Sequence, residues 1–142
     1  MNETDILLST THAGISTVTL NRPKQCNALN SALIKALTQK IKQLDDDMAT
    51  RIIILSGSGA HFCAGADLHW MKGLPDRSFN ENIEETKQLG DLFNALTVCK
   101  KPCITVAQGY IAGGACGILA CSDLVIAPDN AKLCFSEVKL GL

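Results

Sequence analysis

Residues 51–68 read RIIILSGSGAHFCAGADL and join a strand to the turn that follows it. The run 51–57 is short, apolar and β-branched and ends at a glycine, which is typical of a strand covered on both faces. The same order recurs at 103–107, another buried strand, followed by the glycine-rich turn 108–116. We therefore predict a parallel sheet with two glycine-rich loops at the carboxyl ends of its strands.

The segments on either side fit such a sheet. The sequence predicts a strand at 15–20 that ends at Asn21-Arg22-Pro23, and a helix that begins after the N-cap residue Asn30 and ends near residues 45–47. Further patterns predict a helix at about 80–99, a small-residue helix at 113–121 and a strand at 123–127. Alternating strands and helices indicate a single α/β domain over residues 1–142, with its ligand crevice beyond the carboxyl ends of the strands.

Composition narrows the function classes. The 142 residues carry 13 basic and 14 acidic side chains, a formal net charge of −1, and 46% of them are hydrophobic. This balance is unlike that of disordered chains and lacks the cationic excess of nucleic-acid-binding proteins. We expect no nucleic-acid partner.

The cysteines and the first residues of the chain bear on metal binding and on location in the cell. Seven cysteines without a C-x-x-C pair argue against a zinc site and favour a reducing, cytoplasmic setting, and the polar start shows no targeting signal. The uncharged stretch 102–122 carries overlapping G-x-x-x-G motifs, but its proline, glutamine and glycines disfavour a membrane helix. We expect no metal and no membrane partner.

The two glycine-rich turns offer backbone N–H groups to a ligand. Small residues after a strand let a ligand approach the main chain, and the first amides of a helix have no partner within it. Neither turn contains a phosphate-loop motif or a true G-x-G-x-x-G. A nucleotide site is therefore disfavoured, and a developing negative oxygen fits these donors better.

Five blocks of sequence resemble the crotonase (enoyl-CoA hydratase/isomerase) superfamily, in the family's order and across nearly the whole chain. They are Asn21-Arg22-Pro23 with Asn27-Ala28-Leu29, residues 62–68, Gly109 with residues 112–115, Cys121-Ser122-Asp123, and residues 135–142. The resemblance implies a crotonase-like spiral of β-β-α units whose C-terminal helical part is absent from this chain. It also implies a coenzyme A thioester as substrate, with no separate cofactor.

The resemblance also assigns roles to residues. It implies that the amides of Ala66 and Gly114 bind the thioester oxygen and stabilise the enolate charge. It places coenzyme A and substrate along a set of residues that comprises Lys24, Ala28, Ala64, Asp67, Leu68, His69, Gly113 and Gly117. From its position alone, Asp67 is also a candidate N-cap for residues 68–71, which we favour for its side chain.

The acid–base residues are where the chain departs from the family pattern. Hydratases that resemble it hold the reacting water with two glutamates; Glu137 matches the second, whereas Gly117 stands at the place of the first. A glycine side chain cannot move a proton, so the two-carboxylate mechanism does not transfer.

Three functional readings remain open. The first is hydration of a branched enoyl-CoA such as 3-methylglutaconyl-CoA, an intermediate of leucine degradation, with Glu137 as acid–base and a space beside Gly117 open to substrate. The second is Δ3,Δ2-enoyl-CoA isomerisation by the single glutamate. The third is a non-catalytic acyl-CoA-binding or assembly subunit. The resemblance implies a homotrimer or a hexamer built of two trimers, in fatty acid metabolism.

Overall fold

The computed structural model describes residues 7–73 and 77–135, apart from the side chain of Leu8. A five-stranded sheet has the order β1-β2-β3-β4-β6. β1 (Leu7–His12) is antiparallel to β2 (Ile15–Leu20), and the remaining pairings, with β3 (Ile52–Gly57), β4 (Cys103–Val106) and β6 (Leu124–Ile126), are parallel. The predicted parallel sheet is therefore confirmed.

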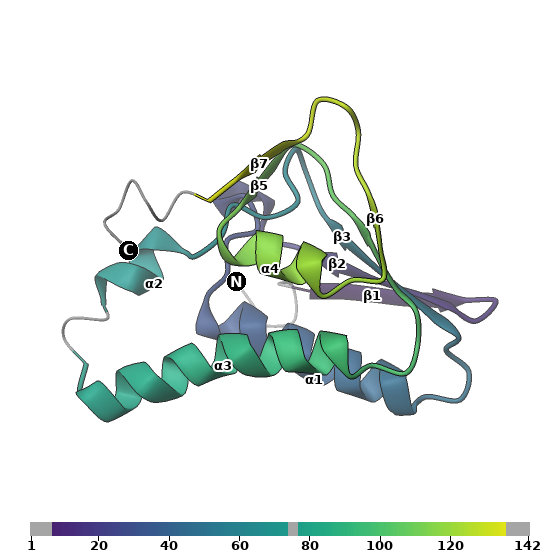
Figure 1. Ribbon diagram of the computed structural model, residues 1–142, viewed down its shortest axis with the longest axis horizontal. Coiled ribbons are helices and arrows are strands. Elements are labelled where there is room, and N and C mark those ends of the chain that lie inside the picture. Colours follow the sequence, from purple (N-terminus) through teal and green to yellow (C-terminus); the bar gives the residue numbers. More distant parts are fainter. Residues whose placement is uncertain (1–6, 74–76, 136–142) are drawn as a thin grey trace.

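Two helices lie side by side along one face of the sheet (Figure 1). α1 (Ser31–Asp46) begins where the sequence predicts, and Asn30 caps it by accepting a hydrogen bond from the Leu33 amide at 2.9 Å. α3 (Phe79–Thr97) begins at a capping box between Ser78 and Glu81. Their apolar faces, which include Leu37, Ile41, Leu92 and Leu96, join the inward side chains of β2 and β3 in a single core.

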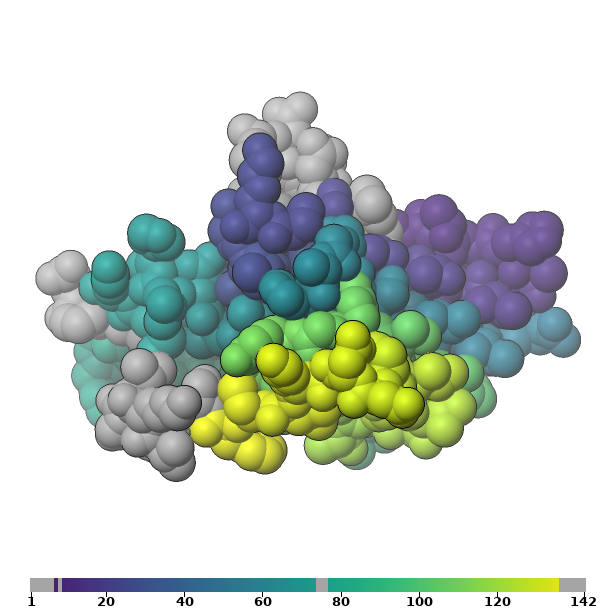
Figure 2. Space-filling model, turned by 90° about the horizontal axis from the view of Figure 1, so that it is seen from above, coloured from purple at the N-terminus to yellow at the C-terminus, as the bar shows by residue number. Residues whose placement is uncertain are grey.

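The remaining elements surround the glycine-rich loops. A 3-10 turn at Pro23–Gln25 follows β2, and the short helix α2 (Leu68–Lys72) follows the loop after β3. β5 (Tyr110–Ala112) leads into α4 (Gly114–Ala120), and β7 (Lys132–Cys134) pairs with β5 in parallel. The stretch from β6 to β7 lies on the outside of the molecule (Figure 2).

Three strands were not predicted. β1 forms a hairpin with β2 through Ala13 and Gly14, both at positive φ, which suits the right-handed twist of two adjacent strands. β5 and β7 have three residues each, and their partners lie more than 20 positions apart. Such short strands leave no readable period in a sequence, because only their pairing defines them.

Candidate active site

A cavity of about 690 Å³ opens between three segments that are distant in sequence. Its walls come from the loop after β2, from the loop after β3 together with α2, and from the start of α4, with Leu89 of α3 closing one side. The lining is mainly apolar. Two of the three segments are the predicted glycine-rich turns, and the third is the loop after β2.

Asn27 fixes the loop after β2. It adopts φ +55°, a conformation that asparagine tolerates better than most residues, and it is fully buried. Its Oδ1 accepts the Arg22 amide at 2.8 Å, and its Nδ2 donates to the carbonyls of Ser58 (2.9 Å) and His61 (2.8 Å). One buried side chain thus ties the loop after β2 to the loop after β3.

Ala66 lines the cavity, and its own amide takes no part in the bridge that its two neighbours make with Leu29. The Leu29 amide donates to the Gly65 carbonyl at 2.7 Å, and the Asp67 amide donates to the Leu29 carbonyl at 2.8 Å. In such a parallel bridge, the N–H of the central residue points to the opposite side. Among the described residues, the Ala66 N–H has no acceptor.

Gly114 offers a second amide at the same cavity. Gly113, with φ 53° and ψ −122°, donates its N–H to the Cys134 carbonyl at 3.1 Å and turns the chain into α4. Gly114 is the first residue of that helix, and within the described part of the chain its N–H has no acceptor either. Ala66 and Gly114 both line the cavity.

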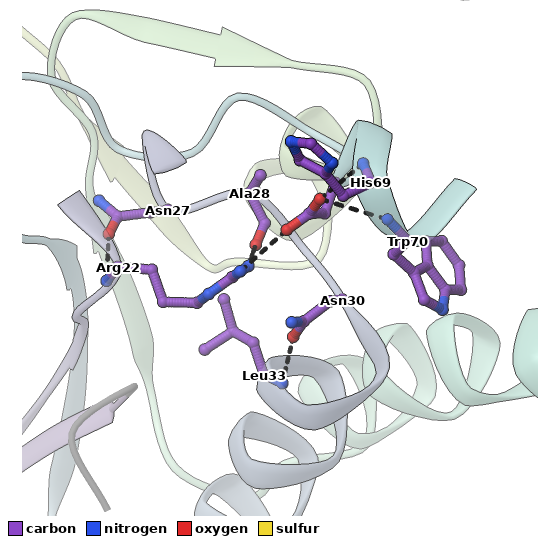
Figure 3. Close-up of polar contacts among 8 residues, drawn as sticks. Arg22, Asn27, Ala28, Asn30, Leu33, His69 and Trp70 are labelled. Atoms are coloured by element: carbon purple, nitrogen blue, oxygen red, sulfur yellow. Dashed lines mark hydrogen bonds and ion pairs between the residues drawn. The ribbon is translucent and has the colours of Figure 1, made fainter. Parts of the chain in front are cut away.

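Arg22 and Asp67 connect two walls of the cavity (Figure 3). Arg22 Nη1 donates to the Ala28 carbonyl at 2.5 Å, and Nη2 donates to Asp67 Oδ2 at 2.8 Å. Asp67 Oδ1 accepts the amides of His69 (2.9 Å) and Trp70 (3.3 Å), so the predicted N-cap is confirmed. Burial raises the pKa of Asp67, but the hydrogen bonds from Arg22, Trp70 and His69 outweigh it, and the net pKa lies below its ordinary value.

Cys63 lies within the loop between β3 and α2 and is fully buried. Burial raises the pKa of its thiol to about 12, so at neutral pH it is a packing residue rather than a nucleophile. In the described ranges, no three His, Cys, Asp or Glu side chains come close enough together to hold a metal ion. None of the helices in residues 7–73 and 77–135 has the length and apolar character of a membrane span.

The structure brings most of the predicted site residues to one cavity. Its lining includes both proposed oxyanion donors, Gly113 and the predicted coenzyme A positions Lys24, Ala28, Ala64, Asp67, Leu68 and His69. Sequence reasoning missed Leu89 and the bridging role of Arg22. Arg22 stood within a quoted block, but nothing in the sequence pairs it with Asp67, 45 positions away.

Gly117 and Glu137 remain to be placed among the predicted site residues. Gly117 is not among its lining residues, and a Cβ built on it would lie 2.4 Å from Cζ of Phe93. The Phe93 ring lies where a side chain at Gly117 would extend, and the expected space beside Gly117 open to substrate stays a prediction. Glu137 lies outside the described residues.

Comparison with known proteins gives one consistent family. The model of a family described as enoyl-CoA hydratase/isomerase matches residues 10–142. A Mycobacterium leprae protein named probable enoyl-CoA hydratase echA8 is 36% identical over 141 residues, covering 97% of this chain and 52% of its own length. The enoyl-CoA hydratase AKT6-1 of Alternaria alternata is 34% identical over 130 residues, covering 92% of this chain and 42% of its own.

Comparison with solved structures gives the same family. The crystal structure of an enoyl-CoA hydratase from Shewanella pealeana superimposes with a TM-score of 0.93 at 36% identity, covering 96% of this chain and 52% of that one. The chain thus spans about half the length of the relatives that it matches.

Proposed function

Because the chain belongs to the enoyl-CoA hydratase/isomerase family, we propose that the protein adds water across the double bond of a 2-enoyl-CoA thioester. The observation that carries the proposal is that Ala66 and Gly114 both line one cavity and that neither amide has an acceptor among the described residues. Two fixed, uncharged donors suit an oxygen that becomes negative during the reaction.

The proposed hydration uses the Ala66 and Gly114 amides to stabilise an enolate. The water oxygen adds to C3 of the enoyl group while its proton passes to Glu137, the electron pair of the double bond moves toward the thioester carbonyl to give an enolate, and Glu137 then returns a proton to C2. Hydrogen bonds from Ala66 and Gly114 to the thioester oxygen strengthen as its charge develops, and one such donor is typically worth about 10²–10³ in rate.

The remaining lining supports a coenzyme A thioester as ligand. Lys24 is exposed at the cavity and can meet a phosphate as a point charge. Ala28, Ala64 and Leu68 give small or apolar contacts, and the main-chain groups near Asp67 and His69 complete the wall. Coenzyme A enters as part of the substrate, and we propose no separate cofactor.

Glu137 is the proposed acid–base residue. Glu137→Gln should abolish hydration while the affinity for coenzyme A, measured by calorimetry, stays within about twofold. Glu84→Gln, which alters an exposed ion pair with Lys87 on α3, is the matched control and should keep full activity. Equal hydration rates in the two variants would remove Glu137 from the mechanism.

The finer substrate proposal is a branched enoyl-CoA such as 3-methylglutaconyl-CoA, which would place the protein in leucine degradation. A second candidate is Δ3,Δ2-enoyl-CoA isomerisation, which needs only one carboxylate and so suits a chain that has glycine at residue 117. One absorbance assay separates them. Hydration removes the conjugated thioester band of a 2-enoyl-CoA, and isomerisation of a 3-enoyl-CoA creates it.

A non-catalytic acyl-CoA-binding subunit is the alternative from another class. It requires coenzyme A thioesters to bind while neither absorbance change occurs. We also propose a homotrimer, or a hexamer of two trimers, in the cytoplasm. The mass of the intact protein by light scattering tests the assembly, and a monomer would overturn it.

A further inference from the structure

Arg22 holds together the loop after β2 and the loop after β3, which form adjoining walls of the cavity. Its planar guanidinium donates in two directions, through Nη1 to the Ala28 carbonyl and through Nη2 to the Asp67 carboxylate. Only 13% of the Arg22 side chain and 9% of the Asp67 side chain are exposed. Figure 3 shows the guanidinium reaching past the loop toward Ala28. Water therefore competes little for these bonds.

The two contacts fall directly beside the bridge that aims Ala66. Ala28 precedes Leu29, and Asp67 follows Ala66, so Arg22 joins the immediate neighbours of the two bridge partners. The bridge itself consists of two main-chain hydrogen bonds. A short bridge of this kind is isolated from the sheets, so its geometry depends on what holds its two strands in place.

Asp67 also fixes the start of the helix that follows Ala66. While Oδ2 accepts from Arg22, Oδ1 accepts the amides of His69 and Trp70 and so fixes the start of α2. Residue 66 is thereby held on both sides, by the bridge to Leu29 and by the capped helix that begins two residues later.

We propose that Arg22 is a positioning residue that sets the direction of the Ala66 N–H through Ala28 and Asp67. This inference rests on the proposed function, in which that N–H binds the thioester oxygen. Arg22 does not line the cavity, so it acts through the bridge rather than by touching substrate.

The consequence is a selective loss of turnover. Displacement of a catalytic group by about 1 Å can cost about 10²-fold in rate, and an oxyanion donor acts mainly in the transition state. Arg22→Met should therefore lower kcat by about 10–100-fold while KM changes less than about threefold. Arg22→Lys keeps the charge beside Asp67 but cannot donate as a two-pronged fork, so its loss should be intermediate.

The test uses the intact protein and a probe that does not require turnover. Cinnamoyl-CoA is a conjugated thioester whose absorption moves to longer wavelength when its carbonyl oxygen accepts hydrogen bonds. We expect the shift on binding to fall by at least half in Arg22→Met. Arg51→Met is the matched control: it removes an exposed arginine that also donates to a backbone carbonyl, that of Ala13, and should keep both the shift and kcat.

Each outcome is decisive. A full shift with unchanged kcat in Arg22→Met overturns the inference, as does a loss that thermal unfolding of the variant explains entirely. If Arg22→Met does not fold, Arg22→Lys carries the same comparison. If the wild type turns over no enoyl-CoA but shifts the probe, the proposed function fails and the role of Arg22 is still measured; if it does not shift the probe, the inference fails too.

Discussion

The ring of Phe93 occupies the space that a side chain at Gly117 would need, with Cζ 2.4 Å from the position of a Cβ at residue 117. Phe93 belongs to α3 and Gly117 to α4, so the contact lets the two helices approach closely. The Phe93 ring thus occupies the place of a side chain at residue 117 and is part of the packing between α3 and α4.

Gly117→Ala tests this contact. Alanine improves helix propensity by up to about 1 kcal/mol, but the displaced ring should cost about 1–3 kcal/mol. We therefore expect a net loss in the free energy of unfolding by urea. In a Phe93→Leu background the same substitution should cost little or stabilise. Equal effects in both backgrounds would contradict the contact.

Gly65→Ala should damage the loop that carries Ala66. Gly65 has φ +85°, and a Cβ there would lie 2.7 Å from the Ala112 carbonyl oxygen. Strain at such a residue costs about 1–3 kcal/mol, and the clash with backbone adds to it. Gly90→Ala is the control, because nothing lies within 4 Å of a Cβ at that helical position, and it should stabilise by up to about 1 kcal/mol. A neutral Gly65→Ala in thermal unfolding would show that the loop is built differently.

Asn27→Asp should strongly destabilise the protein. The substitution replaces an amide that donates to the carbonyls of Ser58 and His61 by a carboxylate that faces the same two oxygens. We expect a loss of about 3 kcal/mol, which should shrink as the pH falls, because a protonated carboxyl can donate to one carbonyl. The exposed Asn80→Asp, in the first turn of α3, should change stability by less than about 0.5 kcal/mol. Similar losses in both variants would contradict the role of Asn27.

Asp67 should make the free energy of unfolding depend on pH in the acidic range. Its pKa is lowered in the folded protein, so its ionised form stabilises the fold above the unfolded value near 3.8, and this contribution disappears as the pH falls through the folded pKa. The difference in unfolding free energy between wild type and Asp67→Asn should therefore be largest near neutral pH and narrow below about pH 4. A constant difference from pH 7 to pH 2 would show that the ionised form of Asp67 is not the one the fold prefers.

The regular elements could be predicted because their information is local. The spacing of Leu33, Leu37 and Ile41 and the N-cap Asn30 determine α1. The β-branched run at 52–54, followed by Leu55, indicates a buried strand whatever its neighbours in the sheet. The N-cap role of Asp67 is also local, because its partners are two and three residues away. The family could also be predicted from local information, because its motifs are short blocks of sequence in a fixed order.

The sequence by itself thus determined the helices, the strands β2, β3, β4 and β6, the parallel sheet, the family and the loops that line the cavity. Only the tertiary structure decided that Phe93 lies where a side chain at Gly117 would extend, that Arg22 meets Asp67 across 45 positions, and that β5 pairs with β7. The reason is physical: a period or a cap depends on residues within a few positions, whereas a side-chain contact or the direction of an amide depends on where distant segments pack. The arrangement of the Ala66 and Gly114 donors is a property of that packing.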